Sequence, residues 1–71
     1  MTTLIERAAT LDVLSDDCLN LESRLIALSA RTDDDFEIEN YALLARQASA
    51  IRAQAESLTN YLRVKAERVK A

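Results

Sequence analysis

Residues 4–28 read LIERAATLDVLSDDCLNLESRLIAL, and their apolar side chains recur at intervals of three and four residues. This spacing places side chains on one side of an α-helix and is typical of helices that pack along their length. The stretch therefore predicts one amphipathic helix at about residues 3–31. Positions a and d of its seven-residue repeat hold Leu4, Leu11, Cys18 and Leu25, and then Arg7, Leu14, Leu21 and Leu28.

A second stretch carries the same repeat and predicts another helix at about residues 35–69. Its a positions hold Tyr41, Ala48, Ala55, Leu62 and Val69, and its d positions hold Leu44, Ile51, Leu58 and Lys65. Two apolar stripes on separate helices require packing of the helices side by side. The predicted hairpin seam consists of Leu4, Leu11, Leu14, Cys18, Leu21, Leu25, Leu28, Tyr41, Leu44, Ala48, Ile51, Ala55, Leu58 and Leu62.

The polar segment between the two stretches, residues 29–40, predicts a turn at about residues 32–35. Its candidate helix caps are Thr32, Asp33, Asp34 and Asp35. Asp34 followed by Glu37 resembles a capping box, and acidic residues in a first turn interact well with the helix dipole. Because a short connection makes two helices antiparallel neighbours, we expect an antiparallel hairpin.

Composition supports an all-α fold, a coiled-coil-like two-helix hairpin over residues 1–71 as a single domain. The 71 residues include no Gly and no Pro, so tight β-turns have few suitable residues. A domain of this size is marginal alone. The single cysteine allows no internal disulfide, and the lack of histidine disfavours zinc. We therefore expect a partner or dimerisation to complete the hairpin.

The segment LSDDCLN, residues 14–20, is the weak point of the first helix. Ser15, Asp16 and Asp17 are poor helix formers in the middle of a helix. A kink there, or a new N-cap at Ser15, is one interpretation. The apolar repeat continues through the segment without a change of phase, which favours one unbroken helix.

Charge is distributed unevenly in this chain of net charge −3. Residues 1–40 carry three Arg and ten Asp or Glu, a net of −7, and residues 41–71 carry six Lys or Arg and two Glu, a net of +4. The basic stretch RVKAERVK, residues 63–70, raises the possibility of nucleic-acid binding. We favour the alternative that its cations interact with the dipole at a helix C-terminus, and we expect no nucleic-acid partner.

No pattern in the sequence predicts catalysis, a cofactor or a metal site. The acidic cluster TDDDFEIE, residues 32–39, lacks the alternating acids and central Gly of an EF-hand. Asp16 and Asp17 are neighbours on a helix, so their carboxylates point about 100° apart and do not converge on one substrate. Cys18 occupies an a position without a neighbouring cation, which favours a small buried apolar residue over a reactive thiol. We expect a non-enzymatic protein.

Location is predicted from what the chain lacks. It contains no apolar run of the roughly 20 residues that cross a bilayer. Its first residues, MTTLIERAA, do not resemble a signal peptide. A lone thiol without disulfides fits a reducing cytoplasm.

Some large apolar residues lie outside the predicted seam and form a candidate partner surface. These residues are Ile5, Leu19, Ile26, Leu43 and Tyr61. Single exposed apolar residues mean little, but several in register suggest a binding surface. The partner can be a second copy, giving a homodimeric four-helix bundle, or a different protein. Spacing alone does not separate these alternatives.

The opening MTTLIERAA and the pairs Asn40-Tyr41, Leu43-Leu44, Gln47-Ala48 and Ala50-Ile51 resemble the small co-chaperones of type III secretion needle subunits. Length and hairpin layout agree over nearly the whole chain. The resemblance implies binding to a helical-repeat, tetratricopeptide-like chaperone, and through it to the needle subunit, which the pair keeps monomeric in the cytoplasm. It also implies that the co-chaperone acts mainly by stabilising the chaperone. A homodimeric structural or regulatory bundle remains the alternative.

Overall fold

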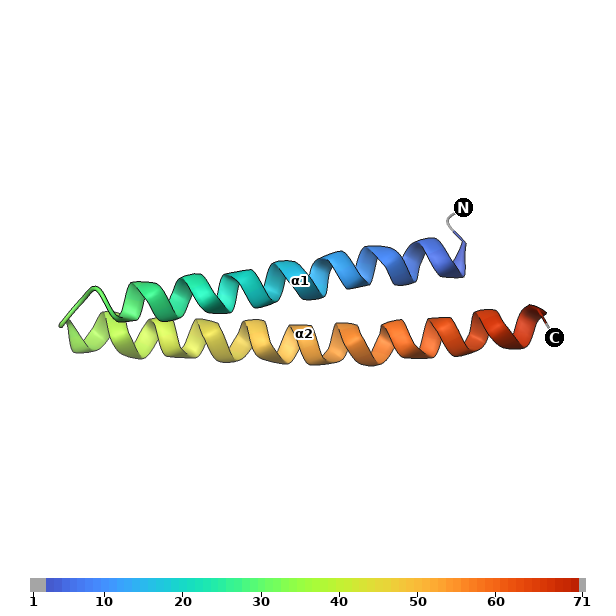
Figure 1. The fold of residues 1–71 in the computed structure, drawn as a ribbon. Coiled ribbons are helices and arrows are strands. Elements are labelled where there is room, and N and C mark those ends of the chain that lie inside the picture. Colours follow the sequence, from blue (N-terminus) through green and yellow to red (C-terminus); the bar gives the residue numbers. More distant parts are fainter. Residues whose placement is uncertain (1–2, 71) are drawn as a thin grey trace.

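The computed structural model describes residues 3–70, so Met1, Thr2 and Ala71 lie outside the description. It consists of α1, Leu4–Ser29, and α2, Asp35–Lys70, which run antiparallel along each other (Figure 1). No strand occurs among residues 3–70. The predicted all-α helical hairpin is therefore confirmed. With extents of 56 × 17 × 13 Å, the chain forms one layer two helices wide, so every helix has a large share of its surface open.

A capping box fixes the start of α1. The Glu6 N–H donates to Thr3 Oγ1 at 3.1 Å, and the Thr3 N–H donates to Glu6 Oε2 at 3.4 Å. From there α1 continues through Ser15–Asp17 without interruption, so the interpretation with a break at that point is wrong. The helix ends at Ser29, slightly before the expected position, and the Ala30 N–H still donates to the Ile26 carbonyl at 3.1 Å.

Asp34 caps α2, as one of the sequence alternatives predicts. Its Oδ1 accepts hydrogen bonds from the N–H groups of Phe36 at 2.9 Å and Glu37 at 3.2 Å. The backbone N–H of Asp34 donates to Thr32 Oγ1 at 3.1 Å. Thr32 thus supplies the second half of the cap, the role that a capping box gives to the side chain of Glu37.

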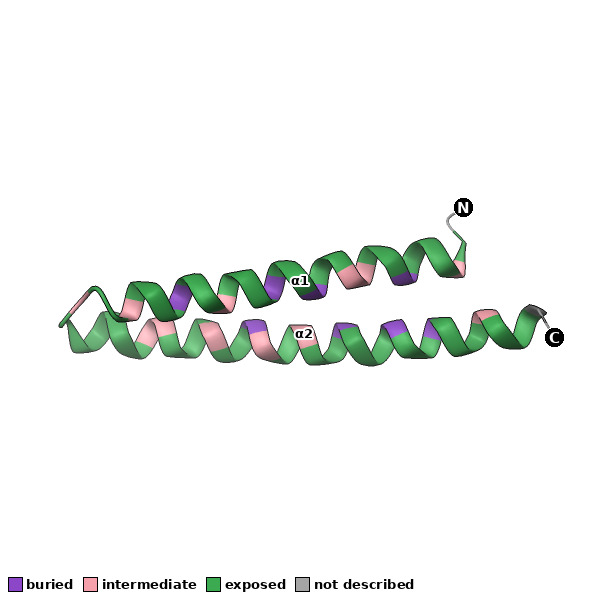
Figure 2. Cartoon of the chain, viewed as in Figure 1, coloured by how far each residue is buried: buried purple, intermediate pink, exposed green. Residues whose placement is uncertain are grey.

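The contact between the helices is formed mainly by small side chains and is continuous along the hairpin (Figure 2). Its buried residues are Ala8, Ser15, Cys18, Leu25, Ala48, Ala55, Thr59 and Leu62. Five of these, Cys18, Leu25, Ala48, Ala55 and Leu62, occupy predicted a positions. Three others, Ala8, Ser15 and Thr59, occupy position e, four residues after a. The two helices therefore face each other through their a and e positions.

The predicted seam needs correction at every apolar d position. Those side chains are 42–50% exposed and lie along one edge of the contact: Leu14, Leu21, Leu28, Leu44, Ile51 and Leu58. The reason is steric, because most e positions hold small residues that allow closer approach of the two backbones than leucine would. Leu4, Leu11 and Tyr41, at the remaining predicted seam positions, are half-buried.

Two ion pairs join the helices and are consistent with the antiparallel register. Arg52 Nε donates to Glu22 Oε2 at 2.9 Å, and Arg63 pairs with Asp12 closer to the open end. The hydrogen bond that Arg52 donates to Glu22 raises the pKa of Arg52 above its ordinary value, and the negative charge of Glu22 adds to this effect. Arg52 and Glu22 are also both e residues, which places their charges at the edge of the small-residue contact.

Candidate partner-binding surface

The six half-exposed residues at the apolar d positions form what we call the leucine face: Leu14, Leu21, Leu28, Leu44, Ile51 and Leu58. Three come from α1 and three from α2. In an antiparallel pair that meets through positions a and e, the d positions of both helices lie on the same side of the hairpin. Leu14, Ile51 and Leu58 line one cavity together, which demonstrates this arrangement directly.

A groove runs along part of the leucine face between the two helices. One cavity of about 200 Å³ lies between Leu14 and Ile51, and a second of about 470 Å³ extends to Arg7 near the open end. Leu11 and Leu58 line both cavities, so the two are continuous. The groove walls are chiefly leucine and isoleucine, which makes it suited to the side chains of another apolar segment rather than to a polar ligand.

Positively charged residues border the leucine face, and we call them the basic rim: Arg7, Arg24, Arg31, Lys65 and Arg68. All are exposed. Arg24 and Arg31 line a hollow with Leu28, and Arg7 lines the groove with Leu58. Lys65 continues the line of Leu58 one heptad later along α2. Two acidic residues, Asp17 and Glu37, also lie along this border. Because the five cations outnumber them, the border is positive in a chain that is negative overall.

The opposite side of the hairpin carries three of the five predicted partner-surface residues. Ile5, Leu19 and Ile26 are exposed and lie on one line of α1, which we call the isoleucine face. Ile5 shares a hollow with Arg63 of α2, and the Asp12–Arg63 ion pair crosses the same side. Acidic and basic side chains therefore interrupt the isoleucine face, and its apolar residues come from α1.

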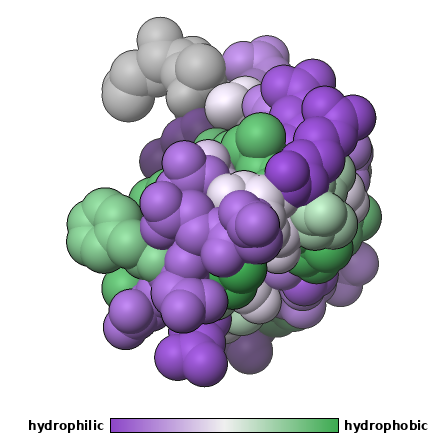
Figure 3. Space-filling model, turned by 90° about the vertical axis from the view of Figure 1, so that its left-hand side faces the viewer, coloured by the Kyte–Doolittle hydropathy of each residue, from purple (hydrophilic) through white to green (hydrophobic). Residues whose placement is uncertain are grey.

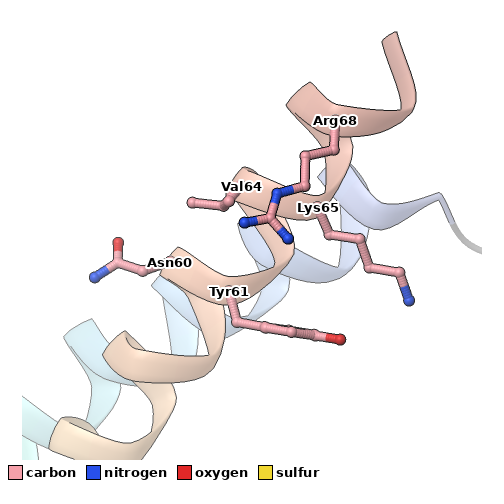
Figure 4. Close-up of a pocket in the computed structure, with 5 residues that line it drawn as sticks. All are labelled: Asn60, Tyr61, Val64, Lys65 and Arg68. Atoms are coloured by element: carbon pink, nitrogen blue, oxygen red, sulfur yellow. The ribbon is translucent and has the colours of Figure 1, made fainter. Parts of the chain in front are cut away.

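Leu43 and Tyr61, the other two predicted surface residues, do not join Ile5, Leu19 and Ile26. Leu43 lies on the side of α2 that points away from α1, because helix geometry turns it about 180° from the contact. Tyr61 lines a hollow made by α2 residues alone, with Lys65 and Arg68 beside it (Figure 4). The Lys65 Nζ lies 5.9 Å from the centre of the Tyr61 ring. The predicted surface is therefore not one face, and the prediction is corrected in this respect.

The turn end of the molecule is acidic and polar. Hydrophilic residues cover the middle of this end, and hydrophobic residues show at its flanks (Figure 3). The carboxylate of Asp34 is used by the cap of α2. Within residues 3–70, no three His, Cys, Asp or Glu side chains are grouped so as to hold a metal ion.

Cys18 and Ser15 are the buried polar or reactive side chains of α1. Cys18 is a free thiol that is 7% exposed within the small-residue contact, the placement that its a position predicts. Ser15 was not predicted to be buried, and its Oγ makes no hydrogen bond to the described protein atoms. On α2 the Thr59 Oγ1 donates to the Ala55 carbonyl at 2.8 Å. The hydroxyl of Thr59 is thus satisfied within its own helix, and that of Ser15 is not.

Neither helix of the described chain is long and apolar enough to span a membrane. Comparison of the chain with protein-family models, with curated proteins and with solved structures finds no match.

Proposed function

We propose that this chain is a non-enzymatic co-chaperone whose leucine face binds a helical-repeat chaperone. In this proposal the pair works in the cytoplasm of a bacterium with a type III secretion system and keeps the needle subunit monomeric. The single observation that carries the binding role is the leucine face, where six large apolar residues from two helices are 42–50% exposed on one side of the hairpin. Contiguous apolar surface of this kind marks interaction sites.

The secretion role is supported by the sequence resemblance and by the hairpin architecture that accompanies it. The resemblance is strongest at residues 40–51, which include Leu44 and Ile51 of the leucine face. A helical-repeat protein offers a concave surface built of stacked helix pairs, into which a slender two-helix rod can pack. Docking there would bury the d residues that the small-residue contact leaves open.

Co-expression of the chain with a needle-subunit chaperone of the helical-repeat type tests the proposal. We expect wild type to co-purify with the chaperone and to raise its melting temperature by mass action. Leu21→Asp, on the leucine face, should abolish co-purification while circular dichroism shows intact helices. Ile26→Asp is the matched control, because it places the same charge on the same helix but on the isoleucine face.

Two results would count against this function. If Leu21→Asp retains the chaperone and Ile26→Asp loses it, the leucine face is not the binding surface. If wild type binds no helical-repeat chaperone encoded near needle-subunit genes, the secretion role is wrong whichever face is used.

A homodimeric structural or regulatory bundle is the second candidate. The observation in its favour is that both helices contribute equally to the leucine face, as each hairpin of a four-helix bundle requires. Analytical ultracentrifugation of the isolated chain separates the candidates, because the bundle predicts a dimer with a concentration-dependent melting temperature.

A further inference from the structure

Charge is segregated between the two sides of the hairpin. The basic rim, five cations with Asp17 and Glu37 as the acids in equivalent positions, lies along the α1 edge of the leucine face and at its open end. The isoleucine side carries an excess of acids, among them Asp12, Asp16 and Glu56. This separation of charge between two sides of the hairpin differs from the separation between the acidic first half and the basic second half of the sequence. Both halves contribute cations to the rim.

We propose that the occupant of the leucine face is an acidic amphipathic helix of another protein, with an apolar stripe flanked by Asp or Glu. The groove along Leu11, Leu14, Ile51 and Leu58 accepts the apolar stripe, as in other helix-in-groove complexes. The basic rim lies where the flanking carboxylates of such a helix would come. This inference rests on the proposed function only in taking the leucine face as a partner-binding surface.

The rim disfavours a second copy of this chain as the occupant. Two leucine faces brought together would place basic rims against each other, and only Asp17 and Glu37 would offer opposite charge. Like charges across an interface suppress association. An acidic helix meets the same cations with opposite charge, which also accelerates the encounter.

A membrane surface is disfavoured by the shape of the face. Interfacial helices insert large side chains that protrude from their apolar side, often aromatic ones. The leucine-face residues are half-buried against each other, and none of the six is aromatic. Of the described aromatic residues, Tyr61 lies among the basic rim, beside Lys65 and Arg68. Phe36, the most exposed of the aromatic residues, lies near the turn, on the side of α2 that points away from α1. The groove is recessed between two helices and suits a ridge of side chains.

Two synthetic helical peptides of about 21 residues test the proposal with the full chain. Both carry one leucine stripe, flanked by Glu in the first peptide and by Lys in the second. By fluorescence anisotropy at low salt, we expect the Glu peptide to bind at least about tenfold more tightly than the Lys peptide. Added salt should reduce this preference, because the rim charges are exposed.

Variants of two exposed arginines assign the preference to the rim. Arg24→Glu, on the rim, should weaken binding of the Glu peptide about fivefold and strengthen binding of the Lys peptide. Arg46→Glu is the matched control on the opposite side of α2, and it should change neither affinity by more than about twofold.

Four results would overturn the inference: equal affinity for the two peptides, binding of neither, self-association that blocks both, or binding to phosphatidylserine vesicles in place of the peptides. Its failure is separable from failure of the co-chaperone role. If the helical-repeat chaperone binds but Arg24→Glu has no effect on that complex, the acidic helix is wrong and the co-chaperone role stands. If the Glu peptide binds with the expected preference and no chaperone binds, the co-chaperone role is wrong and the acidic helix stands.

Discussion

Arg52 of α2 donates a hydrogen bond from Nε to Glu22 Oε2 of α1 at 2.9 Å, and it also contacts Glu56 one turn away on its own helix at 3.5 Å. One guanidinium therefore joins two carboxylates at the edge of the small-residue contact. The pKa of Arg52 is raised, chiefly by the hydrogen bond that it donates to Glu22. A side chain whose pKa is higher in the folded than in the unfolded state stabilises the fold at pH values below its unfolded-state pKa. This stabilisation is lost only as the pH rises through the folded-state pKa.

The stabilising effect of Arg52 should therefore be constant across the alkaline range. Arginine ordinarily titrates above about pH 12, so Arg52 stays charged in both states. We expect the difference in melting temperature between wild type and Arg52→Gln to be the same at about pH 7 and about pH 10. Arg52→Lys is the control, because its lysine begins to lose its proton near pH 10. A wild-type advantage over Arg52→Gln that shrinks by pH 10 would contradict the prediction.

Leu25 and Leu21 should respond very differently to the same truncation. Leu25 is 6% exposed in the contact between the helices, and Leu21 is 48% exposed on the leucine face. Leu25→Ala should reduce the free energy of unfolding by about 2–4 kcal/mol, since it removes buried apolar surface and leaves a cavity. Leu21→Ala should reduce it by about 1 kcal/mol or less. Urea denaturation of the two variants measures both values, and equal losses would refute the placement of the seam.

Ser15→Ala should stabilise the hairpin. The Ser15 side chain is buried and its Oγ lacks a protein partner, so its removal relieves the desolvation of an unpaired hydroxyl. We expect a gain of about 1 kcal/mol in the free energy of unfolding. Ser23→Ala, at an exposed site of α1, is the control and reports helix propensity alone, about 0.5 kcal/mol. A gain at Ser15 no larger than that at Ser23 would show that the hydroxyl is satisfied.

Asp34→Ala should remove the cap of α2. The Asp34 carboxylate accepts from the N–H groups of Phe36 and Glu37, which have no carbonyl four residues earlier within the helix. A loss of about 1 kcal/mol is expected from urea denaturation. Asp33→Ala, one residue earlier and without such a hydrogen bond among the described atoms, is the control. If Asp33→Ala is as destabilising as Asp34→Ala, charge near the helix end is the cause and the cap is not.

The fold could be predicted from the sequence because its signals are long and redundant. Two apolar stripes, an intervening run of cap residues and the lack of Gly and Pro all indicate a helical hairpin. Five of the predicted a positions, among them Cys18 and Ala48, are buried in the contact, whereas Val69, the last one, is exposed. The T-x-x-E pattern of Thr3 and Glu6 is the sequence signal that could have revealed the first capping box.

The rotation of the helices could not be predicted in the same way. The apolar a and d residues together with the mostly small e residues make a stripe wider than one neighbouring helix can cover. The number of apolar residues predicts that leucines such as Leu21 and Leu58 face the other helix. Close approach of the two backbones instead favours Ala8 and Ser15 in the contact, and these are the buried residues. Which of the two faces forms the contact depends on the free energy gained when both helices pack closely. The sequence pattern of a single helix does not contain this information. The basic rim could not be predicted for the same reason, because its residues come together only when the two helices are placed side by side.

The small side chains of the contact also bear on how long the chain survives in a cell. Ala8, Ser15, Ala48 and Ala55 contribute little apolar area, so we expect the isolated hairpin to open readily, and opened chains are substrates for proteases. A partner on the leucine face lowers the opened population by mass action. We therefore expect a pulse-chase experiment to give a shorter half-life without the partner than with it. Surplus copies would be degraded, and the two proteins would stay in matched amounts without shared control of their synthesis.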